Sequence, residues 1–187
     1  MSAALLAWPM TGAAQTLTGQ STAVRATVSD LLGGETTTVL TDTGTLGGTT
    51  DAREASQLTG GVPSLLAGEV LHATTIGWPD QVTSESSLAA LALSVAGATF
   101  GADFVMAQAT AVLNGEAVGT SDLTNLSING VPVSVSGDPN QIFYIPGGQV
   151  VINEQKTAPG GMVVNALHVI VDGVADVVIG SATARIQ

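Results

Sequence analysis

The chain of 187 residues has no cysteine, few aromatic residues and very few basic ones. The absence of cysteine excludes disulfides, thiol catalysis and cysteine-ligated metals. There are 15 Asp and Glu residues against four basic ones, which are scattered along the chain at Arg25, Arg53, Lys156 and Arg185. Nucleic acids require clustered cations, so we expect no nucleic-acid partner, and an anionic membrane surface is disfavoured for the same reason.

The residues that are abundant favour strands. Hydrophobic residues make up 45% of the chain, which is too apolar for disorder. Val, Ile and Thr fit a pleated, half-buried surface, and Gly marks turns. Aromatic residues make up only 3%, too few for the aromatic girdles of an outer-membrane barrel.

Tight turns divide the second half of the chain into hairpins. Asn114-Gly115, Asn129-Gly130 and Asp172-Gly173 supply the two positive-φ positions that a two-residue hairpin turn requires. A fourth hairpin is expected around Pro146-Gly147-Gly148. The expected pairings are 104–113 with 116–119, 126–128 with 131–135, 166–171 with 174–186, and 141–145 with 150–153.

The first half of the chain is less regular. Residues 21–28 alternate and predict a strand, and residues 65–76 predict one or two strands. A short helix is expected over residues 51–58. Together the segments predict an all-β antiparallel sandwich, jelly-roll or Ig-like, with at most one short helix and a single domain over residues 15–187. Residues expected on its buried faces are Val169, Val171, Val177 and Ile179.

Residues 1–14 form a separate apolar segment. Ser2 to Ala14 is uncharged and ends in small residues, typical of a signal peptide that lacks its basic start. The alternative is an ordinary first strand. If the segment persists in the mature protein, we expect it to act as a donor strand for assembly, with contacts from Leu5, Leu6, Trp8 and Met10. It contains Pro9 and is too short for a membrane span.

The tripeptide Asp42-Thr43-Gly44 matches the catalytic sequence of aspartic proteases. Such enzymes use two aspartates that share a proton, so a single copy would require a homodimer. Asp-Thr-Gly also forms a good turn by itself, and the turn is the favoured interpretation.

Other chemistry-bearing residues show no ligand spacing. His72 and His168 lie far apart, each in an apolar run, and no metal or cofactor is expected. Asp138 with Asp122 offers carboxylates to calcium, but without a defined loop. Lys156, the only lysine, lies near Glu154 and Asn165, residue types that condense into an isopeptide crosslink in some surface adhesins. A solvated loop lysine is the favoured interpretation.

The C-terminal third contains a series of short motifs: 137–141 (GDPNQ), 145–148 (IPGG), Ile152 with Asn153-Glu154-Gln155, Val164 with Asn165-Ala166-Leu167-His168, and a closing alternating strand. With these motifs the chain resembles the choice-of-anchor P family. The resemblance covers most of the chain, and its specific part is the C-terminal third. The family comprises bacterial exported surface proteins of undefined activity, so the resemblance implies a surface protein and supplies no catalytic residues.

The sequence therefore predicts an extracellular or cell-surface protein that is not an enzyme. Our first hypothesis is a structural protein that assembles with copies of itself, or with a cell-surface component, by strand addition. The alternatives are a surface module that binds a glycan or protein ligand and, more remotely, the dimeric aspartic protease. Trp8, Trp78 and Tyr144 are the only Trp and Tyr residues, which argues mildly against a glycan site.

Overall fold

The computed structural model describes residues 15–30 and 32–187, and within them the chain is entirely β. The predicted assembly residues Leu5, Leu6, Trp8 and Met10 lie outside the described residues. The strands are β1 (Leu17–Ser29), β2 (Glu35–Asp42), β3 (Ala52–Val62), β4 (Leu66–Gly77), β5 (Gln81–Val95), β6 (Ala98–Val112), β7 (Val118–Thr124), β8 (Ser127–Ile128), β9 (Val131–Pro132), β10 (Gln141–Ile145), β11 (Gly148–Ala158), β12 (Gly161–Val171) and β13 (Ala175–Ile186).

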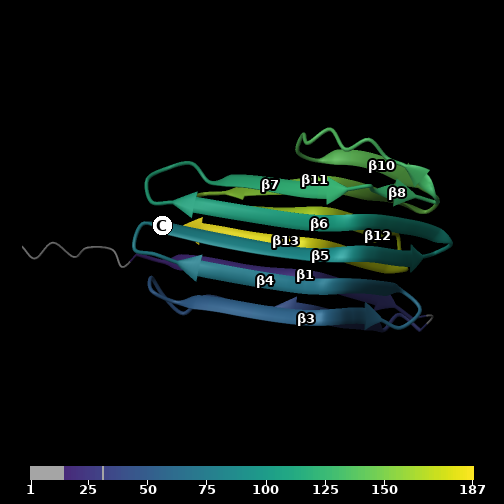
Figure 1. Ribbon diagram of the computed structural model, residues 1–187, viewed down its shortest axis with the longest axis horizontal. Coiled ribbons are helices and arrows are strands. Elements are labelled where there is room, and N and C mark those ends of the chain that lie inside the picture. The colour runs from purple at the N-terminus through teal and green to yellow at the C-terminus, as the bar shows by residue number, and fades with distance from the viewer. Residues whose placement is uncertain (1–14, 31) are drawn as a thin grey trace, which may run out of the picture.

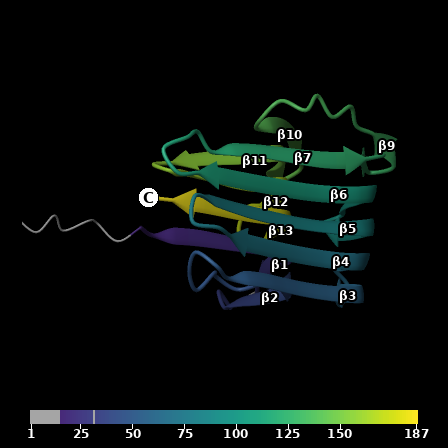
Figure 2. The same ribbon diagram turned by 60° about the vertical axis from the view of Figure 1, so that its left-hand side comes forward.

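Two antiparallel sheets pack face to face, which confirms the predicted β-sandwich (Figures 1 and 2). Sheet A has the strand order β10-β11-β12-β13-β1-β2, and sheet B has the order β3-β4-β5-β6-β8-β9, with β7 also paired to β6. Each sheet is mainly a meander of consecutive strands. The pairing of β13 with β1 joins the two ends of the described chain, so the C-terminal strand lies in the middle of sheet A.

All four predicted hairpins are confirmed. Their closing pairs are Thr110 with Val118, Ile128 with Val131, Ile145 with Gly148, and Val171 with Ala175. The predicted two-residue turn with positive φ at both positions is found at Asn129-Gly130. It is wrong at the other two sites, where only Asn114 and only Gly173 have positive φ and the loops are longer than two residues. The hairpin at Asn129 is shorter than predicted, since it ends at Pro132, which has no N–H to donate.

The predicted helix over residues 51–58 is wrong. These residues belong to β3, which pairs along its length with β4. Ala, Arg, Glu and Gln favour a helix locally, but pairing with a neighbouring strand outweighs a preference of a few tenths of a kcal/mol per residue. Residues 66–77 form one strand. In the part of the chain that is described, no helix is long and apolar enough to cross a membrane.

The core lies between the two sheets and consists mainly of Val, Leu, Ile and Ala. The four residues predicted on buried faces, Val169, Val171, Val177 and Ile179, are all buried. Within most strands, inward and outward side chains alternate, as the period-two pattern predicts.

Along one line that crosses sheet A this alternation is interrupted, because two consecutive residues of a strand both point into the core. On β12 the inward residues are 162, 164 and 166 before the line and 167, 169 and 171 after it. The same change occurs on β13 at Gly180 and on β1 at Ala23. We call the residues on this line the row of sheet A. They are Asn153, Ala166, Gly180, Ala23 and Thr41. On both sides of each of these residues the neighbouring strands pair in the same, unshifted register.

Backbone conformation explains this interruption. Asn153, Gly180 and Thr41, on alternate strands of the row, have positive φ angles of 52°, 64° and 56°. Asn and Gly tolerate this region better than other residues do. At the row, two consecutive residues of a strand point into the core. Successive outward side chains are therefore three residues apart instead of two.

Candidate functional site

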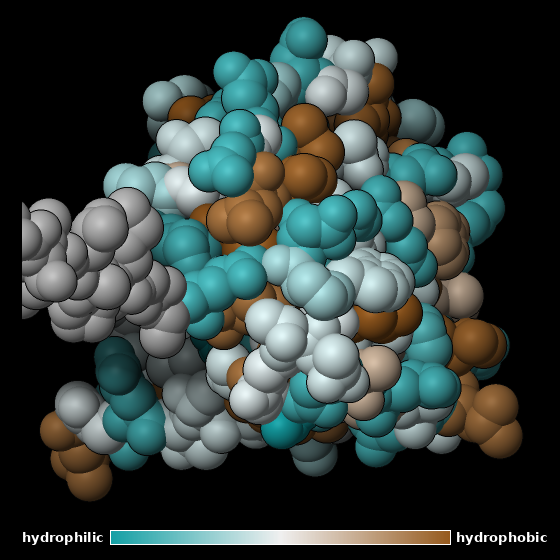
Figure 3. Space-filling view, turned by 90° about the vertical axis from the view of Figure 1, so that its left-hand side faces the viewer, coloured by the Kyte–Doolittle hydropathy of each residue, from teal (hydrophilic) through white to brown (hydrophobic). Residues whose placement is uncertain are grey.

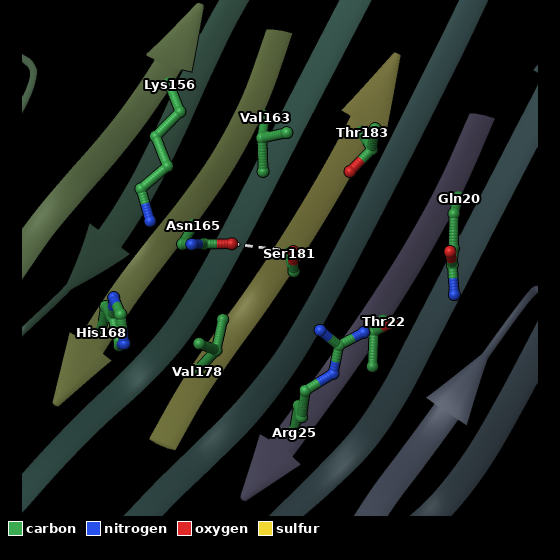
Figure 4. A pocket seen from close by; sticks show the side chains of 10 residues that line it. All are labelled: Gln20, Thr22, Arg25, Lys156, Val163, Asn165, His168, Val178, Ser181 and Thr183. Carbon is green, nitrogen blue, oxygen red and sulfur yellow. Dashed lines mark hydrogen bonds between the residues drawn. The ribbon is translucent and has the colours of Figure 1, made fainter. Parts of the chain in front are cut away.

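A pocket of about 340 Å³ opens on the outer face of sheet A, within the usual size range of ligand sites (Figure 4). Its lining comes from β1, β11, β12 and β13 and consists mainly of polar side chains. The lining residues are Gln20, Thr22, Arg25, Lys156, Val163, Asn165, His168, Val178, Ser181 and Thr183.

The row of sheet A produces this pocket. On three adjacent strands the pocket is flanked by outward residues three positions apart, namely Asn165 and His168, Val178 and Ser181, and Thr22 and Arg25. Three residues of a strand span about 10 Å, whereas the usual two span about 7 Å. Because no side chain points outward between the members of each pair, a trough runs across the strands. We call this pocket the trough.

Glu154 organises one end of the trough. Its Oε2 accepts a hydrogen bond from Asn165 Nδ2 at 2.6 Å and lies 2.9 Å from His168 Nδ1. Its Oε1 lies 2.8 Å from Lys156 Nζ. Glu154 and Asn165 are direct partners on β11 and β12, so the sheet register itself brings them together. The carboxylate is thus held by three neighbours that all lie on the outer face.

These contacts keep Glu154 ionised. Burial disfavours the charged form, but the hydrogen bonds from Lys156 and Asn165 and the interaction with His168 outweigh it, and the pKa of Glu154 lies below its ordinary value of 4.5. The polar network continues on both sides. His168 Nε2 lies 3.0 Å from Asp176 Oδ1, and Ser181 Oγ donates to Asn165 Oδ1 at 2.7 Å.

The middle and far end of the trough contain groups without partners. Arg25 on β1 has no carboxylate within ion-pair distance and donates none of the side-chain hydrogen bonds found among residues 15–30 and 32–187. Thr22 is only 2% exposed, yet its hydroxyl takes part in none of those hydrogen bonds. Figure 4 shows the Arg25 side chain extending along β1 toward Thr22. These groups are available to a ligand.

The residues of the family resemblance divide between the two faces of sheet A. Glu154, Asn165 and His168 meet at the trough, whereas Ala166 and Leu167 are buried in the core. The amides of Asn153 and Gln155 tie β11 to other segments. Asn153 Nδ2 donates to the Gly137 carbonyl, and Gln155 Nε2 donates to the Gly119 carbonyl and to Asn153 Oδ1.

Sequence reasoning missed the part of the trough that β1 and β13 supply. Its residues are Gln20, Thr22, Arg25, Val178, Ser181 and Thr183, which come from both ends of the chain. A usable signal was present in the segment Asn165-Ala166-Leu167-His168, where two small or apolar residues separate two polar ones and break the alternation. The same spacing separates Thr22 from Arg25.

Asp42-Thr43-Gly44 forms a turn where β2 ends at the edge of sheet A. The Asp42 carboxylate accepts hydrogen bonds from the Gly44 N–H at 2.8 Å and from Gln20 Nε2 at 3.0 Å. Gly44 has a positive φ of 66°. The Asp42 carboxylate therefore binds the backbone N–H two residues further along the chain and the Gln20 side chain on β1, in agreement with the turn interpretation.

Lys156 lies within β11, not in a loop as expected, and its side chain is 60% exposed. Its ammonium contacts the same carboxylate as the Asn165 amide. Elsewhere, Asp138 and Asp122 belong to no metal-binding group, since no three or more His, Asp or Glu residues within 15–30 and 32–187 are arranged so that they could hold a metal ion.

No family model, curated protein or solved structure matches the chain. The resemblance to the choice-of-anchor P family therefore stays a prediction, and function must be argued from the geometry of the trough.

Proposed function

We propose that this chain is a non-enzymatic, extracellular surface protein that binds a ligand in the trough of sheet A. The observation that carries the proposal is the trough itself. It is a recess with partnerless polar groups on a sheet face that would otherwise be evenly covered by side chains. Ligand sites are typically concave and present a few convergent polar groups, and this surface has both properties.

The trough is built rigidly, as a binding site should be. It lies in a six-stranded sheet, over β12, β13 and β1, which are each paired on both sides. The row that creates it is fixed by core packing, since a Cβ on Gly180 would lie 3.2 Å from the Ala166 Cβ. A ligand would meet a preformed surface and would lose little affinity to ordering of the protein.

A substitution that fills the trough tests the proposal. Val163 lines the trough on β12 and is partly exposed, so Val163→Tyr should be tolerated by the fold while occupying the ligand space. The full chain would be screened for binding to immobilised bacterial polysaccharides, peptidoglycan and extracellular proteins. We expect at least one class to bind, and Val163→Tyr to weaken that binding about tenfold or more.

The matched control is Val39→Tyr. Val39 is exposed on β2 and pairs with Arg25, so it lies on the same face of sheet A but does not line the trough. The Val39→Tyr variant should bind the same surfaces as tightly as the wild type does. Equal binding by wild type and Val163→Tyr, or no binding to any surface, would contradict the proposal.

Self-association by strand addition is the second candidate function. β3 is an 11-residue strand at the edge of sheet B, with few charges and most of its residues exposed. Leu58 on this strand is 84% exposed, and such an edge is a template for pairing with another chain. At the end of the sandwich seen in Figure 3, apolar patches also lie between polar ones.

Light scattering and electron microscopy test this candidate. Leu58→Lys should reduce self-association, because a lysine on an edge strand opposes pairing. Leu32→Lys is the control, since Leu32 is equally exposed but lies outside the strands. A monomeric wild type, or assemblies that persist in Leu58→Lys, would contradict strand addition at β3.

A further inference from the structure

The geometry points to an acidic oligosaccharide, with carboxylates on its sugar rings, as the ligand of the trough. This inference rests on the proposed binding function and adds the chemical class of the ligand. Two of the four Lys and Arg residues in the chain, Arg25 and Lys156, line this one recess, in a protein whose net charge is −11.

The two cations lie at opposite ends of the trough. Lys156 is on β11 and Arg25 is on β1, three strand spacings away, which corresponds to about 14 Å between the strands. Figure 4 shows the Lys156 side chain directed toward Asn165 and the Arg25 side chain extending along β1 toward Thr22, so both side chains lie along the trough lining. A ligand that engages both must be extended and carry more than one anionic group.

The carboxylates near the trough leave the charge of Arg25 uncompensated, whereas Lys156 forms an ion pair with the ionised Glu154 at 2.8 Å. Glu154 is shared among Lys156, Asn165 and His168, and Asp176 contacts His168. Asp42, beyond Gln20, accepts two hydrogen bonds from the Gln20 amide. Among residues 15–30 and 32–187 the Arg25 guanidinium has no such partner, and a carboxylate can accept two parallel N–H donors from it.

Between the cations, the lining matches a saccharide. Thr22, Ser181, Thr183 and Gln20 present hydroxyl and amide groups, which exchange hydrogen bonds with sugar hydroxyls, and the Thr22 hydroxyl has no hydrogen-bond partner among residues 15–30 and 32–187. Val163 and Val178 supply apolar contact for ring C–H groups. An acidic peptide fits less well, because peptides bind sheets mainly by adding a strand at an open edge, whereas the trough crosses strands that are already paired.

The experiment compares three probes by titration calorimetry on the full chain. They are an oligogalacturonate, the same oligomer with its carboxyls methyl-esterified, and an oligoglutamate peptide of equal length. We expect the oligogalacturonate to bind, and esterification to raise its Kd about tenfold or more, since it removes the charge and keeps the hydroxyls. Added salt should also weaken binding of the free acid.

Charge-neutralising variants locate the site. Arg25→Gln and Lys156→Gln should each raise the Kd for oligogalacturonate about tenfold. Arg185→Gln makes the same change in net charge on β13 outside the trough, and should stay within about twofold. Urea unfolding of each variant would show that the fold is retained.

Several outcomes would overturn the inference. They are equal binding of the acid and its methyl ester, equal effects of Arg25→Gln and Arg185→Gln, and binding of oligoglutamate as tight as that of oligogalacturonate. If the methyl ester binds as well as the acid and Val163→Tyr abolishes both, the trough is still a binding site and only the acidic class is wrong. If Val163→Tyr weakens the binding of neither the acid nor the methyl ester, both the proposed binding function and the acidic class of ligand are wrong.

Discussion

In both sheets the alternation of inward and outward residues is interrupted, but in opposite directions, and only in sheet B does the strand register also shift, between β4 and β5. In sheet A the interruption places two consecutive residues of a strand in the core, as at Ala166 and Leu167. In sheet B it places two consecutive residues outside. These outward pairs are Glu69 with Val70, Ala89 with Ala90, and Asp103 with Phe104. Sheet A is therefore recessed on its outer face, and sheet B carries a ridge.

The two irregularities fit together in the core. In sheet B, successive inward residues are three apart at the ridge, as at Ala102 and Val105 on β6. Gly180 of sheet A packs against this region, since a Cβ at its position would lie 3.6 Å from Val105 Cγ1. The inward pairs of sheet A thus fill space that sheet B leaves open. The trough therefore follows from core packing, whereas the polar side chains that line it are not part of the core.

Enlarging Gly180 should break this fit most severely. Gly180→Val adds a β-branched side chain at a φ of 64° and against the Ala166 Cβ, so both backbone strain and overpacking apply. We expect the free energy of unfolding to fall by about 3 kcal/mol or more. Urea denaturation followed by circular dichroism would measure it.

Gly173→Val separates strain from packing. Gly173 has nearly the same φ, 67°, but no atom lies within 4 Å of its added Cβ. It should therefore show the conformational cost alone and a smaller loss of stability. Equal losses in the two variants would show that the packing at the row contributes nothing.

Glu154→Gln tests the polar lining without changing the core. Removal of the charge weakens the interactions with Lys156, Asn165 and His168, so stability at neutral pH should fall by about 2 kcal/mol. The pKa of Glu154 is lower in the folded protein than its ordinary value of 4.5. Its stabilisation is therefore complete above that pH and is lost as the pH falls through the folded pKa.

The stability difference between wild type and Glu154→Gln should consequently shrink as the solution is acidified below pH 4.5. Glu69→Gln is the control, because Glu69 is exposed on the ridge of sheet B. It should change stability little at any pH. A Glu154→Gln difference that stays constant from neutral to acid pH would show that the carboxylate charge is not what stabilises this end of the trough.

A smaller effect is expected from Asp42→Ala at the edge of sheet A. Loss of the hydrogen bonds from Gly44 and Gln20 should cost about 1 kcal/mol. Asp30→Ala, which removes a comparable turn carboxylate bonded to the Leu32 and Gly34 N–H groups, should cost a similar amount. We expect no acid proteolysis of an unstructured protein by the wild type. Cleavage that is lost only in Asp42→Ala would revive the protease hypothesis.

Sequence reasoning could locate the hairpins because their signals are local. Asn114-Gly115 and Asp172-Gly173 mark where the chain reverses, although their loops are longer than the two-residue turn that these dipeptides favour. The row of sheet A could not be predicted in this way. The interruption of the alternation at Ala23 on β1 lies opposite the one at Gly180 on β13, which is at the other end of the chain. For the same reason, the sequence pointed to Glu154, Asn165 and His168 of the trough, which come from one hairpin, and missed Thr22 and Arg25.

The smallest expected effect concerns Lys156, where the outer face of sheet A brings an amine, a carboxamide and a carboxylate together. Condensation would join Lys156 Nζ to the Asn165 Cγ and release the Asn165 nitrogen as ammonia. It requires an uncharged amine and a carboxyl group able to donate a proton. Both conditions are opposed here, because the Lys156 side chain is 60% exposed and the pKa of Glu154 is lowered. A buried site between the two sheets would favour the reaction, whereas this outer face stabilises the ion pair instead. We therefore expect Lys156 to remain a free amine, and the intact mass of the protein to equal that of its sequence. A mass deficit of one ammonia, absent in both Lys156→Ala and Asn165→Ala, would show that the crosslink forms.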